Sequence, residues 1–246
     1  EKTGGLRPEY NGAQDYDFIF RCTELAGKIV HVPRVLYHWR VHSASTADNP
    51  ASKLYAYEAG KKAIEGNLLR CGETGTVTLR SDYGFYDVEY QLQGTPLVSI
   101  LIPNKDQADT LRICIESIRK KCTYPAFEIL VIENNSTEEA TFSYYKELEV
   151  QGIRVLQYPK QGFNYSAINN FGVREAKGEY LLFLNNDMEV ITPDFMEKMV
   201  SNLQRPQIGA VGAKLYYPDN TVQHAGIIIG IGGIAGHAFL GLARGR

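Results

Sequence analysis

Three apolar segments of this sequence each end in a cluster of polar side chains. In chain order the clusters are Asn104, Lys105 and Asp106; Glu133, Asn134 and Asn135; and Asn185, Asn186 and Asp187. A carboxylate such as Asp187 can hold a divalent ion that keeps most of its water and takes its remaining ligands from a diphosphate. Asparagine side chains can bind the hydroxyl groups of a sugar or a ribose. The residue types therefore indicate a site for a diphosphate ligand held through a metal ion.

Each cluster also has a structural interpretation, because Asn and Asp are common turn and helix N-cap residues. For a single cluster that interpretation is the better one. Three clusters that follow three segments of the same kind favour the ligand site.

The segments that carry the clusters alternate with amphipathic stretches. Strands are expected within residues 97–103, 127–135, 153–159 and 179–187, and helices over 107–122, 137–149, 164–176 and 193–203. This alternation predicts an α/β protein with a mostly parallel, Rossmann-like sheet and helices on both faces. The apolar run 180–184 predicts a strand that is buried on both faces. In such sheets ligands bind beyond the carboxyl ends of the strands, where the clusters fall.

The N-terminal part has the pattern of a smaller α+β segment. Helices are expected within residues 11–28 and 51–70, strands within 29–42, and a hairpin over 76–92 with Tyr86, Val88, Tyr90 and Leu92 on one face. A joint at residues 94–96 divides the chain into residues 1–75, a hairpin and linker at 76–96, and the α/β part at 97–246. Residues 209–241 predict a strand followed by glycine-rich chain.

Composition excludes several classes of protein. The chain has 246 residues, 44% of them hydrophobic, and a net charge of −2, which marks a globular protein without the basic surface that nucleic acids require. No apolar run is long enough to span a membrane, and no signal peptide opens the chain. Cys22, Cys71, Cys114 and Cys122 form no CxxC pair, which favours reduced core thiols in a cytoplasmic protein. Because the first residue is Glu1 rather than Met, we expect the chain to be part of a longer protein or to have been processed.

The strand ends carry a family resemblance. The stretches "PLVSILIPNKD", "FEILVIENNS" and "GEYLLFLNNDMEV" resemble the nucleotide-binding half of a family 2 glycosyltransferase with the GT-A fold. The resemblance implies inverting transfer of a sugar from a nucleotide-diphosphate sugar to a glycan or lipid-linked acceptor, in the cytoplasm or at the membrane surface. It implies that Asp187 binds Mn or Mg. The substrate residues that it implies are Pro103, Lys105, Asp106, Glu133, Asn134, Asn170, Asn185 and Asn186.

The N-terminal part resembles the other, acceptor-side half of the same family. In "GAQDYDFIFR" the resemblance implies that Asp15 is the general base, whereas Asp17 is expected to be structural. In "VLYHWRVHSAS" the residues His38, Arg40 and His42 alternate, so in a strand all three would face one way. They would either meet the diphosphate or form a solvated polar face.

The two halves stand in inverted order along the chain. The first hypothesis is that the chain spans the junction of a tandem glycosyltransferase, such as a rhamnosyltransferase, with neither domain complete. The second is that the halves dock as one permuted domain, with residues 1–70 near the strand end that carries Asp187.

The sequence departs from the family pattern at several positions. Glu133 and Asn134 stand where a pair of acids commonly contacts the base, Asn169 replaces an arginine, and Lys105 replaces an aromatic that often stacks on the base. The sequence therefore leaves three candidate functions: a glycosyltransferase, a nucleotide-binding or scaffolding fragment that transfers nothing, and a nucleotidyltransferase. The last would have a glycine-rich basic loop after the first strand, which "PNKDQAD" is not. We interpret the fingerprint-like "GIGGIA" as a chance match, because no helix is expected after it.

Overall fold

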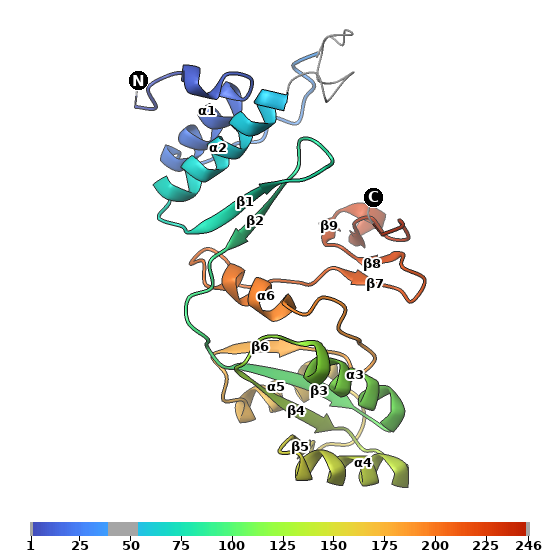
Figure 1. Cartoon of the computed structure of the whole chain (residues 1–246). Helices are drawn as coiled ribbons and strands as arrows, with labels where there is room; N and C mark the ends of the chain where they lie inside the picture. Colours follow the sequence, from blue (N-terminus) through green and yellow to red (C-terminus); the bar gives the residue numbers. More distant parts are fainter. Residues whose placement is uncertain (1, 39–53, 245–246) are drawn as a thin grey trace. The chain divides into compact units, whose positions relative to one another are not determined.

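The computed structural model of the chain describes residues 2–38 and 54–244 (Figure 1). The chain divides into two compact units, Glu1–Gln91 and Leu92–Arg246. The second unit contains all three polar clusters.

The first unit is built from two helices and a hairpin. Its elements are the short 3-10 helix η1 (Pro8–Tyr10), α1 (Gln14–Leu25), α2 (Leu54–Arg70), β1 (Gly75–Leu79) and β2 (Tyr86–Tyr90). Helix α2 packs against α1 and β1, and Ile64, Leu68 and Val77 form the buried centre. Tyr86, Val88 and Tyr90 share the inner face of the antiparallel hairpin, which confirms the predicted hairpin. The placement of Leu92 on the same face is wrong, because β2 ends at Tyr90 and Leu92 packs against the core of the second unit.

The strands predicted within residues 29–42 are not observed where the structure describes them. Residues 29–38 lie in no helix or strand, and Val35, Leu36 and Tyr37 are exposed. β-Branched and aromatic content favours a strand only where a neighbouring strand pairs with its backbone. Nothing in the described part of the chain pairs with this segment. His38 lies in it, whereas Arg40 and His42 lie outside the described residues.

The second unit contains a four-stranded parallel sheet. Its strands are β3 (Val98–Asn104), β4 (Phe127–Glu133), β5 (Arg154–Gln157) and β6 (Tyr180–Phe183), in the order β5-β4-β3-β6. The connecting helices are α3 (Ala108–Lys121), α4 (Glu139–Val150) and α5 (Tyr165–Glu175), and α6 (Phe195–Leu203) follows β6. Each strand and helix predicted in this unit is present, and the α/β class is confirmed.

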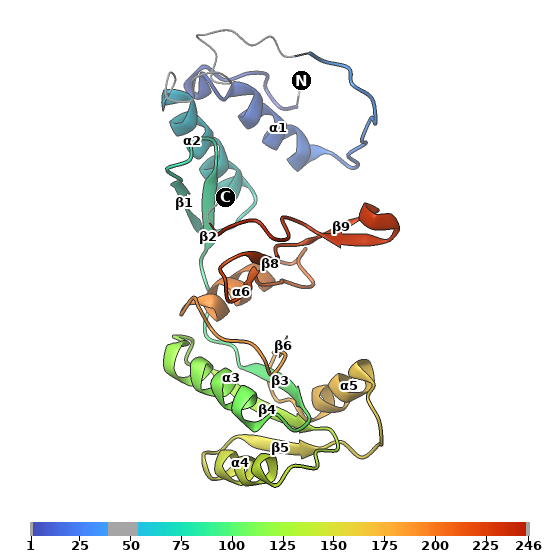
Figure 2. The same ribbon diagram turned by 90° about the vertical axis from the view of Figure 1, so that its right-hand side faces the viewer.

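Helices cover both faces of this sheet. On one face Ile100, Ile102 and Val131 pack against apolar side chains of α3, α4 and α6. On the other face Leu101 and Ile132 pack against α5, which Figure 2 shows on the opposite side of β3 and β4 from α3 and α4. The alternation of inward-facing side chains along β3 and β4 is thus used on both sides, which explains their unbroken apolar runs.

Strand β6 differs from the prediction made for it. The expectation that the run 180–184 is buried on both faces is wrong, because β6 is an edge strand and Leu181 and Phe183 are 36% and 48% exposed. The chain passes from β3 to β4 to β5 and then returns to the other side of β3 for β6. The carboxyl ends of β3 and β6 therefore flank the point where the strand order reverses, where ligands bind in open α/β sheets.

The C-terminal segment, for which one strand followed by glycine-rich chain was predicted, forms short antiparallel hairpins. They comprise β7 (Leu215–Tyr216), β8 (Val222–His224), β9 (Ile227–Ile229) and β10 (Ala235–His237), with the turn η3 (Ile231–Gly233) between the last two. The glycine-rich fingerprint lies in that turn, and positive φ angles at Gly230, Gly232 and Gly233 explain the need for glycine there.

Two findings bear on general properties of the chain. No helix in the described ranges is long and apolar enough to cross a bilayer. All four cysteines are free. Cys114 is a buried core thiol as expected, whereas Cys71 is exposed and was wrongly expected in the core. Burial raises the pKa of Cys114 to about 11, so this thiol is protonated and unreactive.

Candidate functional site

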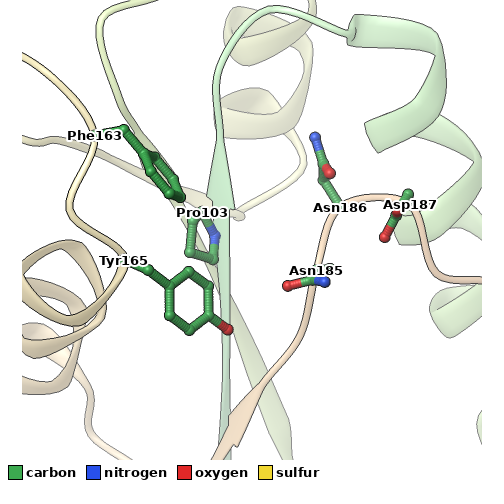
Figure 3. Close-up of a pocket in the computed structure, with 6 residues that line it drawn as sticks. All are labelled: Pro103, Phe163, Tyr165, Asn185, Asn186 and Asp187. Carbon is green, nitrogen blue, oxygen red and sulfur yellow. The ribbon is translucent and has the colours of Figure 1, made fainter. Parts of the chain in front are cut away.

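A pocket of about 470 Å³ lies at the carboxyl ends of β3 and β6. It is lined by Pro103, Phe163, Tyr165, Asn185, Asn186 and Asp187. Figure 3 shows the three residues that follow β6 on one side, Phe163 and Tyr165 on the other, and Pro103 between them. The third polar cluster of the sequence therefore lines a concave site at the predicted edge of the sheet.

A second pocket of about 590 Å³ lies beside the first. The two are adjacent because they share Pro103, Phe163 and Asn186 as lining residues. The rest of its lining combines amides, one lysine and small or apolar residues: Asn104, Lys105, Asn134, Asn135, Thr137, Gln161, Gly162 and Ile168. Members of all three polar clusters thus meet around one pair of pockets.

Asp187 is the carboxylate most available to a ligand. It is exposed, and within the described ranges it makes no hydrogen bond or ion pair. No three His, Cys, Asp or Glu residues of the described chain gather closely enough to hold a metal ion by themselves. A single carboxylate with neighbouring amide oxygens nevertheless suits Mg²⁺ or Mn²⁺, which take their remaining ligands from water and substrate phosphates. The residues present fit a metal that arrives with a diphosphate.

Glu133, by contrast, is 1% exposed and lines neither pocket. Its carboxylate accepts hydrogen bonds from the backbone N–H and hydroxyl of Ser136 and from the hydroxyl of Tyr145. The side chain expected to contact the base is therefore engaged inside the protein.

Asp106 also bonds within the protein. Its Oδ1 accepts hydrogen bonds from the backbone N–H groups of Thr137 and Glu138, at 2.7 and 3.0 Å, just before α4 begins. These two bonds hold the pKa of Asp106 below its ordinary value. Asp106 thus ties the loop after β3 to the start of α4 and lines neither pocket.

The amides of the second cluster have a fixed arrangement in the second pocket. Asn135 Nδ2 donates to Asn134 Oδ1 at 3.0 Å and to the carbonyl of Lys160 at 2.9 Å. Asn134 is 4% exposed and lines the second pocket, and because its Oδ1 is engaged, its Nδ2 group is the part of the side chain that could donate to a ligand. Lys105 is exposed at the same pocket and brings a positive charge to it.

Sequence reasoning missed the loop between β5 and α5. Gln161, Gly162, Phe163 and Tyr165 line the pockets, although the end of β5 carries none of the three clusters. The side chain of Asn164 caps α5 by accepting from the N–H of Ala167. The sequence signal that could have indicated this loop is Phe163, a large apolar residue beside a glycine. In the structure Phe163 is 75% exposed. Asn170, on α5, is exposed and lines neither pocket.

The two aspartates of α1 have opposite environments. Asp15 is exposed, and within residues 2–38 and 54–244 it accepts a hydrogen bond only from the adjacent N–H of Tyr16. Asp17 is fully buried and paired with Arg7 and Arg21. Burial alone would raise the pKa of Asp17, but the hydrogen bonds from the two guanidinium groups outweigh it and lower the pKa. Asp17 is structural, as expected, whereas the side chain of Asp15 is accessible to solvent.

Comparisons with known proteins bear on the same residues. Residues 99–229 match the family model described as Glycosyl transferase family 2. The chain is 43% identical over 244 residues to the O-antigen biosynthesis protein RfbC of Myxococcus xanthus, covering 99% of this chain and 19% of that protein. It is also 43% identical over 244 residues to the uncharacterized protein y4gI of Sinorhizobium fredii, covering 97% of this chain and 27% of that protein.

Solved structures resemble the chain more distantly. A mannosyltransferase from Pyrobaculum calidifontis, in complex with GDP-Man and Mn²⁺, is 18% identical with a TM-score of 0.45, covering 69% of this chain and 47% of that one. The chain thus spans 19% and 27% of the length of the two curated relatives. Since the family model matches more than half of its residues, the chain belongs to glycosyl transferase family 2.

Proposed function

We propose that the second unit binds a nucleotide-diphosphate sugar across its two pockets and that the protein transfers the sugar to a hydroxyl group of a glycan or lipid-linked acceptor. The observation that carries this proposal is the exposed, unbonded carboxylate of Asp187 in the first pocket, directly beside an amide-lined second pocket. The two volumes, about 470 and 590 Å³, lie in the range of small-molecule sites.

The lining residues suggest how the ligand is divided between the pockets. The second pocket suits the nucleoside, because Asn134 presents an amide donor to the base and Phe163 offers an aromatic face for stacking. The first pocket suits the diphosphate and the sugar, with Asn185 for the hydroxyl groups of the sugar. Asn186 lines both pockets and suits the ribose between them, and Lys105 adds a positive charge to the second pocket.

Asp187, with the amide oxygen of Asn185, would hold Mn²⁺ or Mg²⁺. When bound, such an ion neutralises the charge that develops on the departing diphosphate. Phe163, Tyr165 and Pro103 line the apolar side of the first pocket, opposite Asp187. In this proposal Asp187 therefore determines whether the diphosphate can leave.

The acceptor side of the reaction rests on Asp15. In an inverting transfer the acceptor oxygen forms a bond to the anomeric carbon while the bond from that carbon to the diphosphate oxygen breaks. The proton of the acceptor hydroxyl passes to a carboxylate oxygen of Asp15, which is exposed on α1. In the permuted-domain hypothesis Asp15 serves the donor site of this chain, whereas in the tandem hypothesis it serves the donor site of another domain. The small fraction of the relatives' length that the chain covers supports the tandem arrangement.

Calorimetric titration of the chain with UDP, dTDP and GDP, each with and without Mn²⁺, tests the donor site. One nucleotide should bind in a Mn²⁺-dependent manner. Asp187→Ala should weaken that binding by about 100-fold or more, since loss of even an outer partner of a metal ligand costs roughly 10- to 100-fold. Asp109→Ala, which removes an exposed aspartate of α3 away from both pockets, serves as the matched control.

Three results would argue against the donor site: no binding by any of the nucleotides, binding that ignores Mn²⁺, or equal losses in the two variants. A chain that binds the nucleotide but never releases sugar from the matching donor would favour the alternative, a nucleotide-binding module that transfers nothing by itself. One observation favours this alternative. The edge strand β6 has an uncovered face, on which Phe183 is 48% exposed.

A further inference from the structure

A buried chain of hydrogen bonds leads from Glu133 to the residue beside Asp187. Tyr145, on α4, donates its hydroxyl hydrogen to Glu133 at 2.6 Å. The same hydroxyl accepts from Nδ2 of Asn104 at 2.7 Å, and Oδ1 of Asn104 accepts from Nδ2 of Asn186 at 2.7 Å. Glu133, Asn104 and Tyr145 are 1%, 2% and 4% exposed. Asn186 lines both pockets and Asn104 lines the second, whereas Glu133 and Tyr145 line neither.

The direction of these bonds is set at the Glu133 end. The carboxylate of Glu133 acts as an acceptor, so the single hydroxyl hydrogen of Tyr145 points to it. Toward Asn104 the hydroxyl can then only accept, which requires Asn104 to present Nδ2. Asn104 consequently presents Oδ1 to Asn186, and Asn186 must present its own Nδ2.

Two further observations agree with this direction. Nδ2 of Asn104 also donates to the backbone carbonyl of Asp106 at 2.8 Å, and a carbonyl can only accept. Burial raises the pKa of Tyr145, so the phenol keeps the hydrogen that it donates. The amide of Asn186 is thus oriented with its nitrogen turned to the protein and its oxygen available to a ligand.

We propose that Glu133 and Tyr145 are positioning residues of the donor site, which orient Asn186 so that its amide oxygen accepts a hydrogen bond from a hydroxyl group of the bound nucleotide's ribose. This inference rests on the proposed function of the site. It gives Glu133, which no ligand can reach, a role in recognition through Tyr145 and Asn104. Figure 3 shows Asn186 between Asn185 and Asp187, at the position where such a contact would adjoin the metal ligand.

The test compares Tyr145→Phe with Tyr144→Phe in the full chain. Tyr144 is a buried neighbour on the same helix, 3% exposed, and its hydroxyl takes no part in this chain of bonds. Dissociation constants are measured with Mn²⁺ for the nucleoside diphosphate that binds most tightly and for its 2′-deoxy and 3′-deoxy forms. Thermal unfolding of each variant is followed in parallel.

Tyr145→Phe should weaken binding of the parent nucleotide by about 5- to 10-fold, the value of one well-placed hydrogen bond. For one of the deoxy forms the loss should fall below about 2-fold, because the hydroxyl that Asn186 recognises is gone. Glu133→Gln should change binding in the same pattern, since a glutamine can donate to Tyr145 and lets its hydroxyl turn.

A second measurement removes Asn186, the last residue in the chain of hydrogen bonds. If Tyr145 acts through Asn186, then Tyr145→Phe should add nothing to the loss caused by Asn186→Ala. Equal losses for the parent and both deoxy forms, or additive losses in the double variant, would overturn the inference while leaving the donor site intact. A wild-type chain that binds no nucleotide at all would overturn both.

Discussion

The ends of β3 and β4 and the end of β6 carry similar residues but use them differently. At the carboxyl ends of β3 and β4, the carboxylates of Asp106 and Glu133 accept hydrogen bonds from neighbouring groups of the protein. After the carboxyl end of β6, Asp187 has no such partner in the described part of the chain and lines a pocket. A carboxylate that is already satisfied by the protein serves structure, whereas one left unpaired at a concave surface is available for chemistry.

The position of each strand in the sheet explains the difference. β3 and β4 are the central strands, and their register places Asn104 beside Glu133, where both bond to Tyr145 of α4. Groups in that interior must find partners, because an unpaired buried polar group costs free energy. β6 is an edge strand, so the chain that follows it remains in contact with solvent.

Helix α1 also carries one buried, paired carboxylate, Asp17, and one exposed carboxylate, Asp15. The largest expected effect on stability is at Asp17. Asp17→Ala should lower the free energy of unfolding of the first unit by about 3–5 kcal/mol, because it leaves the guanidinium groups of Arg7 and Arg21 without their buried partner. Asp15→Ala should change it by less than about 0.5 kcal/mol, since Asp15 is exposed. Urea denaturation of both variants measures the difference. Similar effects of the two substitutions would remove the contrast.

In the second unit the corresponding pair is Glu133 and Asp187. Glu133→Ala should cost about 2–3 kcal/mol of unfolding free energy, because it leaves the buried hydroxyl of Tyr145 and the N–H of Ser136 without an acceptor. Asp187→Ala should cost less than about 0.5 kcal/mol, although it should weaken Mn²⁺-dependent nucleotide binding by about 100-fold or more. Hydrogen exchange of the β4 amides, read by mass spectrometry, separates loss of stability from loss of binding. A fully stable Glu133→Ala variant would contradict the assignment of Glu133 to the scaffold.

The smallest expected effect is a pH dependence at Asp106. Its folded pKa lies below the ordinary value of 3.8 because the ionised form accepts the two backbone N–H groups before α4. Its stabilising contribution should therefore be complete above that ordinary value and disappear as the pH falls through the lower folded pKa. Asp106→Asn keeps a residue that tolerates the positive φ of 52° and resembles the protonated acid.

The melting temperature of Asp106→Asn should accordingly lie slightly below that of the wild type at neutral pH and approach it in acid. Melting temperatures of both proteins across that pH range check this. A difference that persists in strong acid would show that the charge of Asp106 is not what stabilises the start of α4.

The sequence determined the alternation of strands and helices in the second unit, because apolar runs and amphipathic periods are local properties of the chain. It also placed the polar clusters at the strand ends and indicated the family. The irregular chain at 29–38 shows the limit of local pattern, since strand-forming residues do not form a strand without a partner.

Tertiary structure alone decided which of the polar residues are available to a ligand. Tyr145 reaches Glu133 from α4, and the β5–α5 loop brings Phe163 to the site; neither contact is visible in the spacing of the strand ends. The edge position of β6 likewise depends on where the chain crosses back over the sheet. Burial and hydrogen-bond partners are properties of neighbours in space, and these separate Glu133 from Asp187 where residue type does not.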